Sequence, residues 1–372
     1  MTDRRARSRP AAATPGPRRV SVLAIASTAV VAAVAAIVLW LALVADTTVQ
    51  NLRDEADRAS LRAVYLLPPA DHGDGSAASP ARPGTPPGDD GAPTSAAMVE
   101  PAQITLDVAP IPELIEDSVS GPLPRIANDG RVPWQVYARP FDTADPRPRI
   151  AIVITDMGYA GGATQTAIQR LPGPVTLAFT PYARDLDTWM RQARNAGHET
   201  MLMVPMEPDT YPRDDPGPHT LLTSLEPAAN LQRLEWVLGR GTGYVGVLDT
   251  MGSRFTMAEG VLTPVLEALA TRGLLFLDSR SAPRSLVGMV ADDVGLARVI
   301  NDRIVDGVTE RDVIDLRLQE LEDIARNRGI AVGLASPYPV TFERLAAWIP
   351  GLAERGIALA PVSAIADRQL PR

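Results

Sequence analysis

Short apolar runs alternate with longer amphipathic segments along the chain from Arg149 onward. Such runs are typical of strands buried on both faces of a parallel sheet, and amphipathic segments that end at glycine are typical of helices. We expect strands at 150–154, 175–179, 200–204, 244–248, 274–277, 299–305, 331–334 and 357–361, and helices at 185–196, 228–238, 261–271, 311–328 and 342–354. The alternation predicts an α/β protein with a distorted (β/α) barrel of seven or eight units, and an open doubly wound sheet is the alternative.

The first apolar run ends abruptly in Thr155 and Asp156. A carboxylate at the carboxyl end of a buried strand stands where α/β folds place their chemistry. The polar residues that follow the expected strands are Thr155, Asp156, Glu207, Asp249, Thr250, Ser253, Arg254, Asp278, Ser279, Arg280, Asp306 and Ser336. This set contains no histidine. We expect His198, at a helix end, to be buried or to cap the helix, and His219 to hold its own loop together.

The N-terminal part of the chain predicts a membrane anchor. Residues 20–45 are apolar apart from two serines and one threonine, and a helix needs about 20 such residues to span a bilayer. Six arginines precede this run in residues 1–19, which predicts a cytoplasmic basic tail by the positive-inside rule. We therefore expect a single-pass protein of the cytoplasmic membrane whose C-terminal domain is periplasmic.

The segment between the anchor and the main domain, residues 46–148, has three parts. Residues 46–67 are charged and compatible with a juxtamembrane helix, and residues 68–101 are rich in Pro, Gly, Ala and Ser, which predicts a disordered tether. Residues 103–148 contain scattered apolar positions and the aromatic pair Trp134 and Tyr137, so we expect a lead-in that packs on the domain at 149–366.

The amino-acid composition excludes several kinds of catalytic and metal-binding chemistry. The chain has no cysteine and no lysine, which excludes disulfides, thiolate metal sites, cysteine nucleophiles and Schiff-base lysines. The formal net charge is −8 although the N-terminal tail is basic, so the main domain is acidic. An acidic domain argues against nucleic acid as a partner.

Several segments together resemble the divergent polysaccharide deacetylase family. They are IAIVITDMGY, LPGPVTLAFTPYA, AGHETMLMVPMEP, GPHTLL, YVGVLDTMGSRFT, GLLFLDSRSAPRS and ERGIALAPVSAI, and they follow in family order over residues 150–365. The resemblance implies a distorted (β/α) barrel and an ancestral amide hydrolysis on N-acetylated sugars. In that chemistry one Asp and two His hold a divalent metal, which activates water, while a second Asp acts as the base.

The sequence departs from the family pattern at nearly every catalytic position. Thr155 stands where the family commonly has the base Asp, and Met203 and Thr250 stand where many relatives have histidines. Ser336 and Tyr338 replace histidines of the C-terminal motif. Thioether and hydroxyl groups do not replace imidazoles as zinc ligands, so we expect the ancestral zinc to be lost and no cofactor to be bound. Asp156 is left as a weak candidate metal ligand.

The retained polar residues define the predicted site. Asp156 and Glu207 are the predicted catalytic residues; the predicted substrate-binding residues are Ser253, Arg254, Asp278, Arg280 and Arg284. The arginines would hold an anionic group, and Glu207 and Asp278 would accept sugar hydroxyls. Two alternatives stay open: Asp–Arg pairs that only close the barrel mouth, and a carboxylate-only site in which Asp156, Glu207 and Asp278 hold Mg²⁺ or Ca²⁺.

Two functions follow from this site. The first is a degenerate, membrane-anchored periplasmic protein that acts in envelope carbohydrate metabolism or binding, with an envelope glycan or a protein as its partner. The second is an active hydrolase that cleaves the C–N bond of N-acetyl groups on a polysaccharide with a non-standard site. Fold alone does not decide between them.

Overall fold

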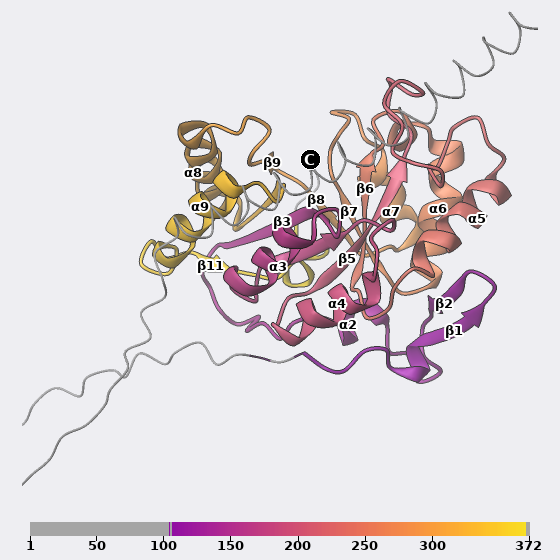
Figure 1. The fold of residues 1–372 in the computed structure, drawn as a ribbon, viewed down its shortest axis with the longest axis horizontal. Coiled ribbons are helices and arrows are strands. Elements are labelled where there is room, and N and C mark those ends of the chain that lie inside the picture. The colour runs from indigo at the N-terminus through magenta and orange to yellow at the C-terminus, as the bar shows by residue number, and fades with distance from the viewer. Residues whose placement is uncertain (1–103, 105, 370–372) are drawn as a thin grey trace, which may run out of the picture. The chain divides into compact units, whose positions relative to one another are not determined.

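The computed structural model describes residue 104 and residues 106–369 (Figure 1). The predicted cytoplasmic tail, membrane anchor, juxtamembrane helix and tether all lie outside these residues. Among the residues that the structure describes, no helix combines the length and the apolar character that crossing a membrane requires.

A wholly parallel nine-stranded sheet forms the centre of the described domain. Its strands are β3 (Arg149–Met157), β4 (Thr176–Phe179), β5 (Thr200–Met206), β6 (Gly246–Met251), β7 (Leu275–Asp278), β8 (Arg298–Ile300), β9 (Arg303–Ile304), β10 (Ile330–Ala335) and β11 (Ala358–Leu359). The order is β8-β7-β6-β5-β4-β3-β10-β9, with β11 paired to β3. Each expected strand is confirmed, and so is the α/β class, although the region expected as one strand at 299–305 forms two.

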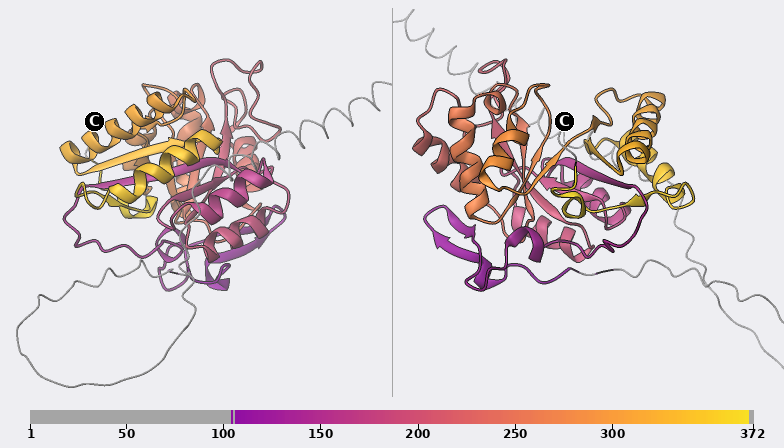
Figure 2. Two further views of the ribbon diagram at one scale, coloured as in Figure 1. Left: turned by 60° about the vertical axis from the view of Figure 1, so that its left-hand side comes forward. Right: turned by 180° about the vertical axis from the view of Figure 1, so that it is seen from behind.

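The sheet curves into a half-barrel, as two further views show (Figure 2). Residues 298–304 form both end strands of the sheet. At one end β8 pairs with β7, and at the other end β9 pairs with β10. Between them, the Asn301 N–H donates to the Asp278 carbonyl and the Asp302 N–H donates to the Val332 carbonyl. The first and last strands of the domain, β3 and β11, are also paired. These pairings disfavour the open doubly wound alternative.

Helices connect the strands and cover the outer face of the sheet. They are α3 (Gly161–Arg170), α4 (Leu186–Asn195), α5 (Pro227–Leu238), α6 (Glu259–Thr271), α7 (Val287–Val294), α8 (Arg311–Arg328) and α9 (Pro339–Trp348). The sequence analysis missed α3, which begins with two glycines and buries only a short apolar stripe, and α7, which has 8 residues. The helix expected at 342–354 ends at Trp348 and continues as the 3₁₀ turn η3 (Ile349–Gly351).

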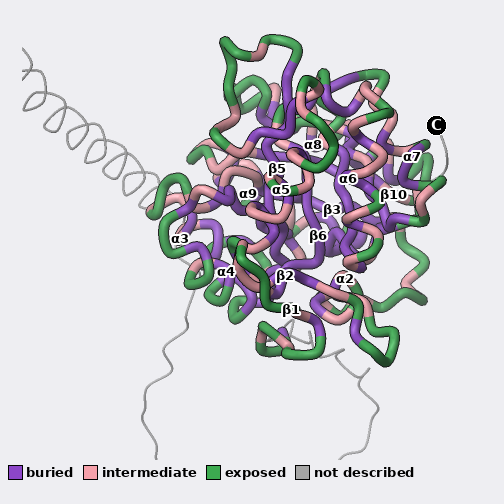
Figure 3. The backbone as a smooth tube through the Cα atoms, turned by 90° about the vertical axis from the view of Figure 1, so that its right-hand side faces the viewer, coloured by how far each residue is buried: buried purple, intermediate pink, exposed green. Residues whose placement is uncertain are grey.

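Side chains alternate along the strands between two separate cores. Ile150, Ile152 and Ile154 of β3 face outward and pack with the helices, whereas Ala151 and Val153 face the concave interior. The buried strands lie beneath a more exposed helical layer (Figure 3). Because the side-chain period of a strand is 2, the inward set continues at the strand ends as Thr155, Thr250, Ser279, Asn301 and Ser336.

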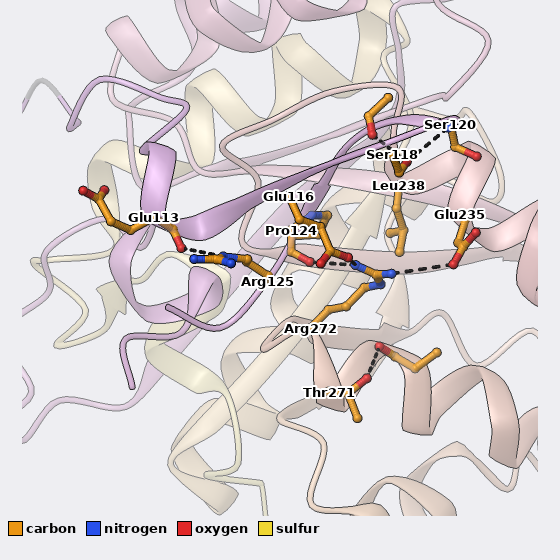
Figure 4. Close-up of polar contacts among 12 residues, drawn as sticks. Glu113, Glu116, Ser118, Ser120, Pro124, Arg125, Glu235, Leu238, Thr271 and Arg272 are labelled. Carbon is orange, nitrogen blue, oxygen red and sulfur yellow. Dashed lines mark hydrogen bonds and ion pairs between the residues drawn. The ribbon is translucent and has the colours of Figure 1, made fainter. Parts of the chain in front are cut away.

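The lead-in packs on the domain and closes the end of the sheet where the strands begin. It contains the 3₁₀ turn η1 (Pro112–Leu114), the hairpin β1 (Ile115–Ser118) and β2 (Gly121–Pro124), and α2 (Pro133–Val136). Leu114 and Tyr137 are buried in the interior core. Figure 4 shows how Arg272, next to the end of α6, links the hairpin to α5. Its Nη1 lies 2.7 Å from Glu116 Oε1 in β1, and its Nη2 lies 3.6 Å from Glu235 Oε1 in α5.

Arg194, at the end of α4, clamps the lead-in a second time. Its buried guanidinium donates to three backbone carbonyls: Tyr137 at 3.0 Å, Gly243 at 3.0 Å and Asp107 at 2.9 Å. Gly243 precedes β6, so this clamp lies at the amino-terminal end of the strands. The lead-in is therefore a part of the folded domain, which begins well before Arg149.

Candidate strand-end site

The backbone bends sharply at Asp156. The pairing of β3 with β4 shifts register between Ile154 and Met157, and Asp156 has a left-handed φ of 58°. Bulges of this kind re-aim a side chain, and a left-handed non-glycine residue is strained. Asp156 therefore departs from the inward–outward alternation of its strand.

Asp156 is held by two neighbours. Its N–H donates to the sulfur of Met203 at 3.1 Å, and the Thr155 hydroxyl lies 2.8 Å from its Oδ2 and 3.3 Å from the Ala335 carbonyl. Burial raises the pKa of the Asp156 carboxyl above its usual range, and the hydrogen bond from Thr155 offsets a part of that shift. The Thr155 hydroxyl is thus the one hydrogen-bond donor to this carboxyl among the described residues.

A second carboxyl, Asp306, lies beside Asp156. Its Oδ2 accepts hydrogen bonds from the Ser336 N–H at 2.7 Å and from the Thr341 hydroxyl at 2.6 Å. Burial raises the pKa of Asp306, and the negative charge of Asp156 adds to that rise. We call the group formed by Thr155, Asp156, Met203, Thr250, Asp306 and Ser336 the strand-end site.

The donor set of the strand-end site does not fit the metal of the ancestral chemistry. Apart from the two carboxyls it offers a thioether, which already accepts the Asp156 N–H, and hydroxyls. The Thr250 hydroxyl is buried and has no hydrogen-bond partner among the described residues. No group of three His, Asp or Glu side chains in the described part of the chain is arranged to hold a metal ion, so Asp156, Glu207 and Asp278 do not form the carboxylate-only site considered above.

Glu207, the other predicted catalytic residue, lies in a different environment. Its Oε2 accepts from the Thr223 N–H and hydroxyl, and its Oε1 accepts from Arg254 Nη1 at 3.0 Å. Burial works to raise the pKa of Glu207, but these donors outweigh it and hold the pKa below the usual range. Glu207 therefore ties the long loop after β5 to the turn after β6.

Asp278, the last residue of β7, and Asp249, within β6, form a buried acidic pair. Asp249 accepts from the Ser279 N–H at 2.7 Å and from the Ser279 hydroxyl at 2.6 Å, and Asp278 accepts from the Arg280 N–H at 2.8 Å. Burial, together with the charge of Asp278, raises the pKa of Asp249. The pair fixes the path of the loop after β7, which carries two of the predicted substrate-binding arginines.

The predicted binding residues are not brought to one place by side-chain contacts. The Ser253 hydroxyl accepts the Asp209 N–H at 2.9 Å, and Arg254 is paired with Glu207. Arg280 and Arg284 are exposed, and no ion pair within the described residues engages either guanidinium. Arg280 also has a left-handed φ of 55°, like Asp156 at the end of β3.

The two described histidines lie outside the strand-end site. His198 is buried with Nδ1 2.8 Å from the Val175 carbonyl and Nε2 3.2 Å from the Ile168 carbonyl, so its predicted buried role is confirmed. His219 stacks on Trp236 with the ring centroids 3.5 Å apart, which fixes its loop against α5. Burial lowers the pKa of both imidazoles.

Tyr159, Tyr338 and Asp306 lie at or next to the strand-end site, although none of them is among the catalytic or binding residues predicted from the sequence. Tyr159 follows β3 and Tyr338 follows β10, and both side chains are largely exposed, at 64% and 46%. They come from the two strands on which Asp156 and Ser336 lie, and these strands are neighbours in the sheet. The aromatic residue three positions after Asp156, in IAIVITDMGY, was the available signal.

A parallel α/β half-barrel with polar residues gathered at its strand ends defines the class of this protein. Residues 152–366 match the model of the family described as divergent polysaccharide deacetylase. The match covers more than half of the sequence, and the chain belongs to the divergent polysaccharide deacetylase family.

Similar proteins occur in three bacteria. The chain is 25% identical over 207 residues to an uncharacterized protein of Haemophilus influenzae, covering 55% of this chain and 72% of that protein. It is 25% identical over 201 residues to the uncharacterized protein YibQ of Escherichia coli, covering 52% of this chain and 60% of YibQ. The crystal structure of an uncharacterized protein from Agrobacterium tumefaciens is 37% identical, with a TM-score of 0.64, and covers 66% of this chain and 99% of that chain.

Proposed function

We propose that this protein binds an envelope glycan without the metal-dependent chemistry of polysaccharide deacetylases. The observation that carries the proposal is the contact between the Asp156 N–H and the Met203 sulfur. It places a thioether directly against the one acid that the ancestral metal site would share with this chain. Thr155 and Thr250 complete a set of side chains that offers hydroxyls in place of the base and the imidazole.

Glycan binding suits the side chains that remain. Asp156 and Asp306 carry carboxyl oxygens that can accept hydrogen bonds from sugar hydroxyls. The exposed rings of Tyr159 and Tyr338 supply flat apolar faces that can pack on a pyranose ring, with hydroxyls for hydrogen bonding. Pockets for small molecules commonly combine apolar and aromatic walls with a few polar groups in this way.

We further propose that the half-barrel is a distorted (β/α) barrel of the deacetylase type, which residues 298–304 complete. In this proposal residues 20–45 anchor the chain in the cytoplasmic membrane, and the Pro-rich tether carries the domain into the periplasm. Anchoring and reach are what a protein needs in order to contact the cell wall from the membrane. A protein partner on the same surface is the alternative to a glycan.

A second function is favoured by the strain at Asp156. Left-handed non-glycine residues and acids with raised pKa values cluster at catalytic sites, and Asp156 has both properties. In this candidate function Asp156 acts as the acid or base of a hydrolase that cleaves the C–N bond of N-acetyl groups without the ancestral metal.

One experiment separates these functions. The full-length chain, purified in detergent, is incubated with insoluble peptidoglycan and with soluble N-acetylglucosamine oligomers; bound protein and released acetate are measured together. Binding without acetate supports the first proposal, and Asp156→Ala should weaken it. Acetate release that Asp156→Asn abolishes supports the second. Stoichiometric zinc in active protein, or no binding to any glycan, contradicts the first.

A further inference from the structure

A cavity of about 480 Å³ lies between the loop after β7 and the segment that leads into α8. Ser279 and Arg280 line it from the first side, Arg303, Ile304 and Val308 line it from the second, and Arg317 of α8 completes it. Its volume is within the range of small-molecule sites. Because Ser279, Arg280 and Val308 all follow strand ends of a parallel sheet, the cavity is on the same side of the sheet as Asp156.

The cavity carries an excess of positive charge in an acidic protein. Arg303 Nε lies 2.5 Å and Arg317 Nη1 lies 2.9 Å from the same Glu320 carboxylate, so two guanidinium groups share one acid. Arg280 adds a third cation, and no carboxylate in the described region pairs with its guanidinium. Asp302, the acid that also lines the cavity, already accepts the Val332 N–H at 3.0 Å and lies 3.8 Å from Arg328.

The lining of the cavity also includes apolar residues that are solvent-exposed. Ile304 is 53% exposed and Val308 is 50% exposed, although both are large hydrophobic residues. Pro283 and Val313 add further apolar surface to the lining. The cavity therefore fits a ligand that carries an anionic group on a small apolar substituent. A bare phosphate or a neutral sugar would leave one of the two surfaces unused.

Asp306 connects the cavity to the strand-end site. Gly307 and Val308 line the cavity, and the preceding Asp306 carboxylate bonds to Ser336 and lies within the electrostatic reach of Asp156. The chain thus passes directly from the strand-end site into the lining of the cavity.

We propose that the cavity binds the carboxylate of an acidic amino sugar, with Ile304 and Val308 against the aliphatic group that carries it. The lactyl ether of N-acetylmuramic acid has this chemistry, with a carboxylate and a methyl group on one carbon. Arg280 is the main contact because its guanidinium is uncommitted, whereas Arg303 and Arg317 supply the surrounding positive potential. This inference rests on the proposed glycan function and names the class of sugar.

The test compares three sugars with the full-length protein in detergent by isothermal titration calorimetry. We expect N-acetylmuramic acid to bind about tenfold more tightly than N-acetylglucosamine, because charge-assisted hydrogen bonds to a carboxylate contribute on that order. Arg280→Met should remove this preference by weakening the binding of N-acetylmuramic acid. Arg170→Met is the control, since Arg170 is an exposed arginine at the end of α3 and does not line the cavity, and it should retain the preference.

Each other outcome has a defined meaning. If N-acetylmuramic acid and N-acetylglucosamine bind equally, or if Arg280→Met and Arg170→Met behave alike, the cavity proposal is wrong while glycan binding stands. If N-acetylglucosamine 6-phosphate binds more tightly than N-acetylmuramic acid, the ligand is a phosphate and the assigned carboxylate is wrong. If no sugar binds, both the proposed glycan binding and this inference are wrong. Thermal melting of each variant should match the wild type, because Arg280 makes no ion pair within the described residues.

Discussion

Asp156 and Glu207 both follow a buried strand and both look catalytic in the sequence, yet their surroundings shift their pKa values in opposite directions. Burial dominates at Asp156, whose carboxyl has one hydroxyl donor. At Glu207, Thr223 and Arg254 supply donors to both oxygens and outweigh burial. The difference teaches that an acid at a strand end is available for ligands only when the neighbouring loops leave its oxygens unoccupied.

The largest change is expected from restoring ligands around Asp156. Thr155, Met203 and Thr250 share the inward alternation of their strands. The combination of Thr155→Asp, Met203→His and Thr250→His should therefore let the chain, which we expect to bind no zinc, retain one zinc ion after dialysis. Elemental analysis of the full-length protein measures the metal. Adding Asp156→Ala should abolish retention. A triple variant without zinc would show that these positions no longer converge.

The next largest effect is expected from removing Glu207, the acid that is paired with Arg254. Glu207→Ala removes the acceptor of three hydrogen bonds and leaves partly buried donors of Thr223 unpaired, so we expect a loss of about 2–4 kcal/mol in the free energy of unfolding. Urea titration followed by circular dichroism measures this loss. Asp209→Ala is the control, because the Asp209 carboxylate is exposed and lies 4.0 Å from the Arg254 guanidinium; the stability of this variant should stay near that of the wild type. Equal effects would contradict the scaffold role of Glu207.

The two acids should also differ in the pH dependence of stability. The folded pKa of Asp156 is raised, so its contribution is fully present below about pH 4 and is lost as pH rises through the folded pKa. Asp156→Asn should therefore be closest to the wild type in stability at or below pH 4 and should be more stable than the wild type at pH 8.

Glu207→Gln should behave in the opposite way. The folded pKa of Glu207 is lowered, so its contribution is present above the unfolded value of about 4.3 and disappears as pH falls through the folded pKa. The wild type should exceed Glu207→Gln at pH 7 and lose that advantage near pH 3. Unfolding curves at four pH values test both variants, and parallel profiles would refute the contrast.

The smallest effect is expected at Met203. Met203→Leu preserves volume but removes the sulfur that accepts the Asp156 N–H, and we expect a loss of about 0.5–1 kcal/mol. Met201→Leu is a matched control on the same strand, since Met201 is also buried in the interior core and makes no such contact. Differential scanning calorimetry resolves the two, and a Met201→Leu loss as large as that of Met203→Leu would discount the sulfur contact.

Much of the fold follows from local pattern, whereas the site does not. The apolar run 150–154 predicted β3, and Gly273 and Gly329 marked the ends of α6 and α8, because strand and helix periods are local properties. The contact between Glu207 and Arg254 joins residues 47 positions apart, and Asp306 reaches Ser336 across 30 positions. No local pattern encodes such contacts. Grouping Glu207 with Asp156 as catalytic was a reasonable interpretation of identical residue chemistry, and it stays a prediction.

The split at residues 298–304 illustrates the same limit. The sequence reads as one apolar strand, interrupted only by Asn301, Asp302 and Arg303. Those residues turn the chain from β7 toward β10. There the Asp302 carboxylate accepts a hydrogen bond from the Val332 N–H. Whether a strand changes partners midway depends on the curvature of the whole sheet, which emerges only when all strands are assembled.

The Arg194 clamp determines where mechanical load would enter the domain. A pulling force applied to the chain before residue 106 reaches Asp107 first, and its carbonyl is held by Arg194 together with the carbonyls of Tyr137 and Gly243. These bonds lie at the amino-terminal ends of the strands and would be sheared in series with the hairpin contacts of Arg272. The strand-end site is at the opposite end of the sheet. In the anchored arrangement proposed above, tension on the N-terminal side would therefore be absorbed before it distorted the surface that we propose for the glycan.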